Sequence, residues 1–244
     1  MYSTFIFFLL ALISEIIGTI GGFGSSVFFV PVAEFFFDFK SVLILTAVFH
    51  DFSNASKLIL FRKYINFRLL ILYGIPSTVF VIAGAYLSNY LQSIYNELIL
   101  GVFLILFSVF VFMNPLFRLP VSKVSAIAGG SAAGFLAGLV GTGGAIRGVS
   151  LTAFNLDKNV FIATSAAIDF FVDMSRTVVY LHNGYYKPSH LFYILVLIVV
   201  AFAGSWIGKK TLVKISQENF RRIVLGLLLM IGITMIVKVL LSSQ

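Results

Sequence analysis

A succession of long apolar segments is the feature that most limits what this chain can fold into. Eight such segments make up most of the 244 residues, and 60% of the residues are hydrophobic. A helix needs about 20 mostly apolar residues to cross a bilayer. Only 11% of the residues are charged, too few to cover a soluble domain, in which about 25% is usual. The sequence therefore predicts an all-α polytopic membrane protein and excludes a soluble enzyme, a disordered chain and a nucleic-acid-binding domain.

Two of the eight segments are too long for a single crossing, and each contains a glycine cluster near its middle. The first, residues 4–37, contains Gly21-Gly22-Phe23-Gly24-Ser25-Ser26, and the fifth, residues 125–154, contains Gly141-Thr142-Gly143-Gly144. We expect both to break at these glycines. The other six have the length of single helices: 41–61, 67–87, 98–113, 159–181, 190–207 and 223–241.

The order of glycines and polar residues occurs twice along the chain. The matching pairs are Gly21 and Gly141, Gly24 and Gly144, Asp51 and Asp169, and Gly84 and Gly204. Chance likeness between apolar strings is the alternative, but the order is kept along a whole half. We interpret the chain as two repeats, residues 1–114 and 125–244, joined by a cytoplasmic linker at 115–124. Internal repeats are common in secondary transporters.

The basic residues indicate how the segments cross the membrane. If every segment crosses once, the loops divide Lys and Arg seven against seven. If the fifth segment instead enters and leaves by one face, eleven basic residues share one side and three the other. Basic residues concentrate in cytoplasmic loops, which favours the second arrangement. The cytoplasmic loops would then be 62–68, 114–124, 155–158 and 208–222.

The fifth segment is therefore predicted to be a re-entrant hairpin of two half-helices, and the repeat extends this prediction to the first segment. Each repeat would be one broken-helix hairpin plus three transmembrane helices. Since three is odd, the repeats would have inverted topology, with both termini outside. The apolar run that begins at Thr4 follows no Lys or Arg and contains Glu15, so we expect it to be retained. The two breaks should meet near the midplane, where such transporters hold substrate.

The glycine breaks are the first candidate anion site. Glycine lets the backbone approach a ligand closely, and a helix that begins at a break presents the positive end of its dipole. Serine and threonine hydroxyls add hydrogen-bond donors. The candidate substrate-binding residues are Gly22, Gly24, Ser25, Ser26, Gly141, Thr142, Gly143 and Gly144. The alternative is that these glycines serve only close helix packing.

Polar residues inside helix 41–61 are a second candidate, because intramembrane charges are usually functional. His50, Asn54 and Lys57 recur on one face of this helix and are assigned to substrate binding. Lys57 could instead extend its amine to the nearby helix end. Asp51 lies about 100° around the helix from that face and is a proton-coupling candidate.

Arg147 follows the second break by three residues. Its planar guanidinium suits the oxygens of a carboxylate, sulfonate or phosphate, so it is assigned to substrate binding. The alternative is an ion pair with Glu15, Glu34 or Asp169. Glu15 is itself a candidate for proton coupling or for a helix-end role.

A polar stripe follows helix 159–181 at Ser165, Asp169, Asp173 and Arg176. Arg176 is a further substrate-binding candidate, although a structural pair with either aspartate is the alternative. Two carboxylates and one guanidinium leave one negative charge unbalanced, which makes Asp169 and Asp173 proton-coupling candidates. Permanent neutralisation by Lys57 or Arg147 is the competing interpretation.

These residues resemble the TauE/SafE sulfite exporter family, also called the sulfonate/toluenesulfonate uptake permeases. The first break followed by Pro31 is similar to the family's first-repeat motif, and residues 138–148, Gly-Leu-Val-Gly-Thr-Gly-Gly-Ala-Ile-Arg-Gly, are similar to the second. The likeness continues through 151–156 and 163–166 to Asp173 and Arg176, and covers essentially the whole chain. Leu151 departs from the repeat at the position of Pro31, and serines replace glycines at 25 and 26.

The resemblance implies transport of sulfite, an organosulfonate or another sulfur oxyanion, and in some members a carboxylated anion. We therefore predict alternating-access transport of a small sulfur oxyanion across the cytoplasmic membrane of a prokaryote, with a proton as candidate coupling ion. An anion channel and a carboxylate transporter are the alternatives, and an intramembrane enzyme lacks a recognisable signature. The expected partners are the small anion and membrane lipid, without nucleic acid, and the oligomeric state is open. No cofactor is expected, and no metal, because cysteine is absent and the three histidines lie far apart.

Overall fold

Helices account for the architecture that the computed structural model describes, over residues 2–21, 24–114, 120–152, 154, 156–211 and 217–242. The elements are α1 (Tyr2–Gly21), α2 (Ser26–Ala33), α3 (Phe39–Phe61), the 3-10 turn η1 (Arg62–Tyr64), α4 (Phe67–Tyr90), α5 (Ser93–Met113), α6 (Lys123–Val140), α7 (Gly144–Thr152), α8 (Lys158–His182), α9 (His190–Thr211) and α10 (Gln217–Ser242). Within these residues there is no strand, and six helices, α1, α3, α4, α5, α6 and α9, are long and apolar enough to cross a membrane. The predicted all-α polytopic membrane protein is confirmed.

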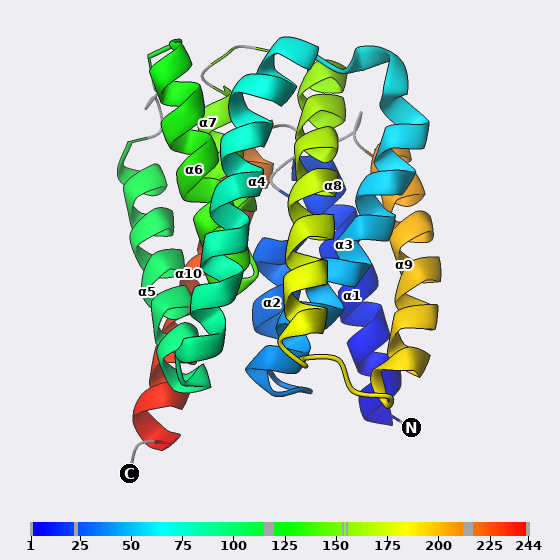
Figure 1. The fold of residues 1–244 in the computed structure, drawn as a ribbon, viewed down its shortest axis with the longest axis vertical. Helices are drawn as coiled ribbons and strands as arrows, with labels where there is room; N and C mark the ends of the chain where they lie inside the picture. Colours follow the sequence, from blue (N-terminus) through cyan, green and yellow to red (C-terminus); the bar gives the residue numbers. More distant parts are fainter. Residues whose placement is uncertain are drawn as a thin grey trace.

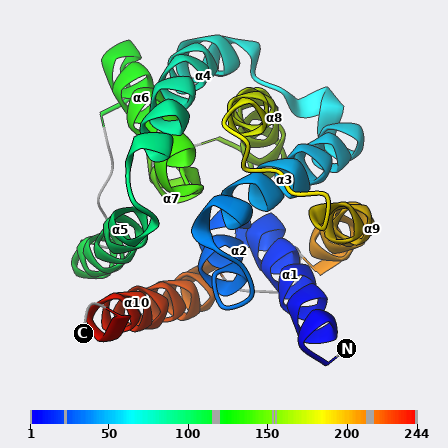
Figure 2. The ribbon, with the colours of Figure 1, turned by 60° about the horizontal axis from the view of Figure 1, so that its bottom comes forward.

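The path of the chain is followed most easily in Figure 1, where both termini lie at the bottom. There α1 rises from the N-terminus and α2 turns back down, after which α3, α4 and α5 alternate in direction. The second half starts from the top: α6 descends, α7 turns back up, and α8, α9 and α10 alternate. Seen from below in Figure 2, the short helices α2 and α7 lie towards the middle of the molecule.

The two broken segments differ from the predicted pairs of half-helices. Their first limbs have full length, 20 residues in α1 and 18 in α6, whereas the returning limbs α2 and α7 have 8 and 9. At 1.5 Å per residue, α1 is about 30 Å long, the thickness of a hydrocarbon core. Each broken segment therefore consists of a first limb that is long enough to cross most of the hydrocarbon core and a returning limb at most half as long.

Several helices extend beyond their predicted bounds. α5 begins at Ser93 instead of 98, α9 ends at Thr211 instead of 207, and α10 begins at Gln217 instead of 223. The added turns contain polar residues such as Asn96 and Lys209. Hydropathy detects only the part of a helix that lies in hydrocarbon, whereas the backbone hydrogen bonding continues into the interface.

Glycines with left-handed backbone occur at both breaks. Gly24 has φ of 82° and Gly141, which caps the end of α6, has φ of 81°. Residues with a Cβ are strained in this conformation. The sequence repeat matched Gly24 to Gly144. At the two breaks, however, the glycines with the left-handed conformation are Gly24 and Gly141.

A row of small residues holds the second hairpin against α4. Gly130, Gly134 and Gly138 recur every four residues on α6, and a Cβ on Gly134 would overlap the carbonyl group of Ser77 on α4. Such rows let membrane helices pack with their backbones close together. On α4, a Cβ on Gly84 would likewise overlap the carbonyl of Phe135.

Outside the helices, the α2–α3 loop is joined to the α8–α9 loop by an ion pair. The Nζ of Lys187 lies 2.7 Å from the Oδ2 of Asp38, whose carboxylate also accepts hydrogen bonds from Ser41 at the start of α3. Partial burial on its own raises the pKa of Asp38. The hydrogen bonds from Lys187 and Ser41 outweigh that effect and lower the pKa to about 2.

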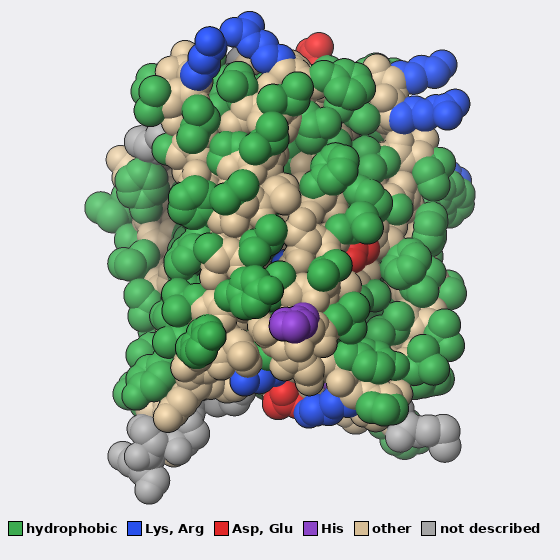
Figure 3. Space-filling model, in the orientation of Figure 1, with side chains coloured by type: hydrophobic (Ala, Val, Ile, Leu, Met, Phe, Trp, Pro, Cys, Tyr) green, Lys and Arg blue, Asp and Glu red, His purple; other side chains and the backbone are tan. Residues whose placement is uncertain are grey.

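On the face of the molecule shown in Figure 3, apolar side chains cover the middle and basic side chains gather at the two ends. The end at the top of Figure 1 has more of them. Among the described side chains, the basic residues at that end are Arg62, Lys63, Arg68, Lys123, Lys158, Lys209 and Lys210, and those at the other end are Lys40 and Lys187.

Candidate anion site

The two glycine breaks meet inside the molecule. Ser26 begins α2 and Thr142 precedes α7, and their hydroxyl oxygens are 3.3 Å apart. A Cβ on Gly24 would lie 3.1 Å from a terminal nitrogen of Arg147. Each break therefore contacts residues of the other, and α2 and α7 begin next to each other. Gly22 of the first cluster lies outside the described residues.

Arg147, on α7, is 4% exposed and is held by α8. Its Nε donates to the Oγ of Ser165 at 2.7 Å, and its Nη1 forms an ion pair with Asp169. Asp169, one of the partners considered from the sequence, is in contact with Arg147. The carboxylate of Asp169 thus meets the guanidinium as the oxygens of a bound anion would.

Glu15 is the centre of a second cluster and is fully buried. The Nζ of Lys57, on α3, lies 2.9 Å from the Glu15 Oε1, so its amine turns inward instead of reaching for the helix end. Hydroxyl groups from four parts of the chain also donate to this carboxylate: Thr19, Ser25, Ser53 and Ser205. The ammonium group neutralises the carboxylate and the hydroxyl groups hydrogen-bond to it, which offsets the free-energy cost of burying its charge.

The third cluster connects α3, α6 and α8. Arg176 lies 2.7 Å from Asp173, and Asn54 of α3 donates to the other oxygen of Asp173 at 2.8 Å. Arg176 also donates to the carbonyl oxygens of Ala137 and Gly141 at 3.0 and 2.8 Å. A cation at these carbonyls favours the C-terminal end of α6. The guanidinium therefore holds the second break in place.

Two small cavities lie on either side of the Arg147–Asp169 pair. Cavity A is lined by, among others, Ser26, His50, Gly141, Gly143, Gly144, Asp173 and Arg176, and cavity B by Thr19, Gly24, Asn54, Lys57 and Ser165. Arg147 and Asp169 line both. Since α3 rises and α8 descends in Figure 1, cavity B lies nearer the basic end and cavity A nearer the termini.

Neither cavity has room for an oxyanion. The centre of a water-sized sphere can move through about 10 Å³ of cavity A and about 20 Å³ of cavity B, which is room for about one water molecule. In this structure the buried cations Lys57, Arg147 and Arg176 bind carboxylates of the protein.

A family model described as "Sulfite exporter TauE/SafE" matches residues 7–235. The chain belongs to the TauE/SafE sulfite exporter family. No curated protein and no solved structure matches it. The family is one of membrane transporters and not of enzymes, so a small anionic substrate and a membrane environment follow at the level of the family.

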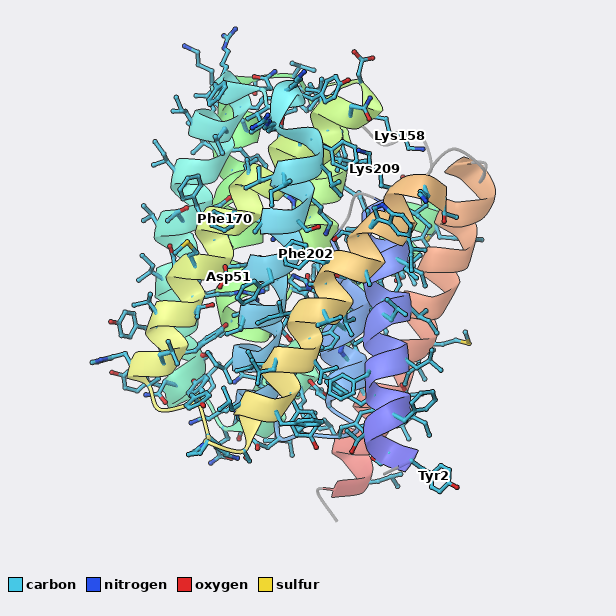
Figure 4. The ribbon with its side chains drawn as sticks, turned by 90° about the vertical axis from the view of Figure 1, so that its right-hand side faces the viewer. Tyr2, Asp51, Lys158, Phe170, Phe202 and Lys209 are labelled. Carbon is cyan, nitrogen blue, oxygen red and sulfur yellow. The ribbon has the colours of Figure 1, made fainter. Side chains whose placement is uncertain are left out.

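Asp51 lies away from both cavities of this TauE/SafE member. Figure 4 shows it near Phe170 of α8 and Phe202 of α9, on the side of α3 that faces the viewer. The Oγ1 of Thr177 donates to one of its carboxylate oxygens at 2.9 Å. The structure therefore separates Asp51 from Asp169, its counterpart in the repeat.

The role of Gly143 differs from that of its neighbours. A Cβ there would overlap the carbonyl group of Ala133 on α6. Close packing against α6, the alternative considered from the sequence, therefore constrains this glycine, which also lines cavity A. Gly144 begins α7 and lines cavity A.

Three hydroxyl donors of the Glu15 cluster, Thr19, Ser53 and Ser205, were absent from the sequence-based site. Ser205 stands where the first repeat has Ala85, and this departure within an otherwise matched stretch is a signal that could have identified it. Thr19 follows Glu15 by four residues, the spacing that places two side chains on one helix face. Among the described residues, no three His, Asp or Glu side chains are placed to hold a metal ion.

Proposed function

We propose that this protein carries sulfite or a small organosulfonate across the plasma membrane of a prokaryotic cell by alternating access, coupled to a proton. The observation on which this rests is the position of Arg147. Its guanidinium lies where the two glycine breaks meet, and it lines both cavities. A planar guanidinium binds two oxygens of a sulfonate or sulfite at once, which an ammonium cannot do.

The rest of the proposed anion site comes from the breaks. Gly24, Ser26, Gly141, Thr142 and Gly144 would offer backbone and hydroxyl donors at the beginnings of α2 and α7. Lys57 and His50 line the cavities on either side. Asn54 and Arg176 are engaged with Asp173, so we assign them to holding the site in shape.

The presence of two separate cavities supports alternating access. Cavities A and B lie towards opposite ends of the molecule, and the Arg147–Asp169 pair lies between them. A channel would instead need a continuous path. The course of the chain also supports two inverted repeats, since α1 and α2 start from the bottom of Figure 1 and α6 and α7 from the top. Rocking of one repeat against the other would open each cavity in turn.

The partners of the buried cations support proton coupling through one carboxylate. The sequence predicted one unbalanced negative charge on α8, with neutralisation by Lys57 or Arg147 as the alternative. In the structure Asp169 is paired with Arg147 and Asp173 with Arg176, in agreement with that alternative. An anion that binds Arg147 must therefore replace Asp169. A proton on Asp169 would remove the competing charge. This favours Asp169 over Asp173 and Asp51 as the carboxyl that exchanges with substrate.

The basic end of the molecule is proposed to face the cytoplasm, which places both termini outside. The support is the concentration of Lys and Arg at the end that carries Arg62 and Lys209. Loops 62–68, 114–124, 155–158 and 208–222 would then be cytoplasmic, although residues 115–119, 155 and 212–216 of these loops lie outside the described part of the chain.

Uptake of labelled sulfite by proteoliposomes tests the proposal. Arg147→Ala should lower uptake by about 10- to 100-fold, because a charge-assisted hydrogen bond contributes roughly 1.5–3 kcal/mol. Arg147→Lys should be nearly as harmful, since lysine lacks the fork. Arg68→Lys, a change at an exposed arginine, is the matched control. Saturable counterflow is expected. Non-saturable flux would indicate an anion channel. Competition by carboxylates but not by sulfonates would indicate a carboxylate transporter.

A further inference from the structure

A chain of hydrogen bonds runs through Ser25 from α3 to α1. The Nε2 of His50 lies 2.9 Å from the Ser25 Oγ, and the Ser25 Oγ donates to the Oε2 of Glu15 at 2.5 Å. Because the serine proton points to the carboxylate, His50 carries its own proton on Nε2 and donates to Ser25. All three side chains are buried, at 5%, 1% and 0% exposure.

The two ends of this chain reach different cavities. His50 lines cavity A. Glu15 accepts hydrogen bonds from Thr19 and Lys57, and both of these line cavity B. Ser25 itself lines neither cavity. The chain therefore connects A with B beside the Arg147–Asp169 pair, which closes the direct route.

We propose that Ser25 relays protons between His50 and Glu15 and so carries them between the cavities along a route separate from that of the anion; the proposal rests on the transport function above. His50 takes up a proton from cavity A on its second ring nitrogen. Its Nε2 proton then moves to the Ser25 Oγ while the Ser25 proton moves to Glu15. The imidazole is left neutral, the serine is restored, and Glu15 has become a carboxylic acid.

Protonation of Glu15 also offers a way to couple the two routes. Lys57 is the basic residue in contact with Glu15, and α9 contributes only the hydroxyl of Ser205. When Glu15 is neutral, the ammonium of Lys57 has lost its counter-charge and attracts an anion into cavity B. The cations near His50 are Lys57, Arg147 and Arg176. They are paired with Glu15, Asp169 and Asp173 respectively, and of these carboxylates Glu15 is the one that the hydrogen bonds through Ser25 connect to His50.

The chain offers a matched pair of serines to test this relay. Ser25 and Ser205 both donate to Glu15 and are both buried, but Ser25 alone of the two contacts His50. Ser25→Ala breaks the relay, Ser25→Thr keeps a hydroxyl, and Ser205→Ala removes one donor without breaking the relay. Glu15→Gln keeps the shape of the carboxyl group but cannot accept the proton.

Proteoliposomes with an internal pH dye would report proton flux and sulfite counterflow in the same preparation. In the wild type and in Ser205→Ala, sulfite uptake should be accompanied by proton movement. Ser25→Ala and Glu15→Gln should lower the number of protons moved per sulfite by about half or more, because a proton carried on Asp169 does not depend on the relay. Ser25→Thr should restore the proton movement.

The outcomes separate the two proposals. Wild-type protein without sulfite counterflow would overturn the transport function and the relay with it. Counterflow with an unchanged proton-to-sulfite ratio in Ser25→Ala would overturn the relay alone. An equal fall in the proton-to-sulfite ratio in Ser205→Ala would also overturn the relay, because Ser205 is not part of the hydrogen-bond chain from His50 to Glu15. If Ser25→Ala does not fold, the ratio in Glu15→Gln decides, and an unchanged ratio there contradicts the relay.

Discussion

Replacing Asp169 with Asn separates the structural and substrate-binding roles of Arg147. The change removes the charge opposite the guanidinium and keeps the size of the side chain, while Ser165 still accepts from the Arg147 Nε. Breaking a buried ion pair on one side costs about 3–5 kcal/mol, because the remaining charge is left uncompensated. We expect the free energy of unfolding of Asp169→Asn to fall by about that amount.

Sulfite should reverse much of this loss. In Asp169→Asn the guanidinium has no competing carboxylate, so the anion can bind Arg147 without first displacing a negative charge. Ligand at 100 times its dissociation constant adds about 2.7 kcal/mol to the free energy of unfolding. The wild type should gain less from the same sulfite concentration, because there the anion must first displace Asp169.

The measurement is denaturant unfolding of the purified protein in detergent, with and without sulfite. Asp173→Asn is the matched control, because it removes the counter-charge of Arg176 in the same way. The Arg176 guanidinium still donates to the carbonyl oxygens of Ala137 and Gly141. This variant should be destabilised without being rescued. The double variant Arg147→Gln with Asp169→Asn should lose less than the sum of the two single changes, by about 0.5–3 kcal/mol. Equal sulfite stabilisation of Asp169→Asn and of this double variant would refute the assignment of Arg147 to the anion.

Three further predictions concern packing, pH and orientation. Gly134→Leu should abolish folding or lower the melting temperature sharply, measured by thermal unfolding in detergent, because any Cβ there overlaps the backbone of α4. Lys187→Met should destabilise the protein by up to about 1 kcal/mol at pH 6, since the pair with Asp38 is partly exposed; the difference should disappear as the pH falls from about 4 to about 2, because the lowered pKa of Asp38 contributes stability only above that range. The chain contains no cysteine, so single cysteines at Lys63 and Gln92 can be labelled in whole cells, and only that at Gln92 should react from outside.

Each of these predictions has an outcome that contradicts it. An unchanged melting temperature in Gly134→Leu would mean that α4 and α6 are not closely packed. A Lys187→Met difference that persists below pH 2 would show that the effect does not depend on the Asp38 carboxylate. External labelling at Lys63 would reverse the proposed orientation.

Much of the helical framework could be predicted from the sequence because it depends on local properties. Apolar runs of about 20 residues indicated the spanning helices, and the glycine clusters indicated where α2 and α7 begin, at Ser26 and Gly144. Burial of Glu15 and Arg147 followed from their positions inside apolar segments. Hydropathy showed that each long segment must break, but it did not show that the first limb runs almost to the full length of a spanning helix.

The pairing of the buried charges was decided only by tertiary structure. Helical periodicity shows that Asp169, Asp173 and Arg176 share a face, but not which other helices that face meets. Arg147 and Asp169 lie on separate helices, as do Glu15 and Lys57. Both pairings depend on how the helices pack and at what height each side chain lies. The sequence by itself determined that several charges had to be neutralised inside the membrane, because hydrocarbon tolerates few of them alone. The packing of the helices decides which partner neutralises each charge. The position of the Arg147–Asp169 pair between two cavities likewise depends on the contact between the two breaks in the folded protein.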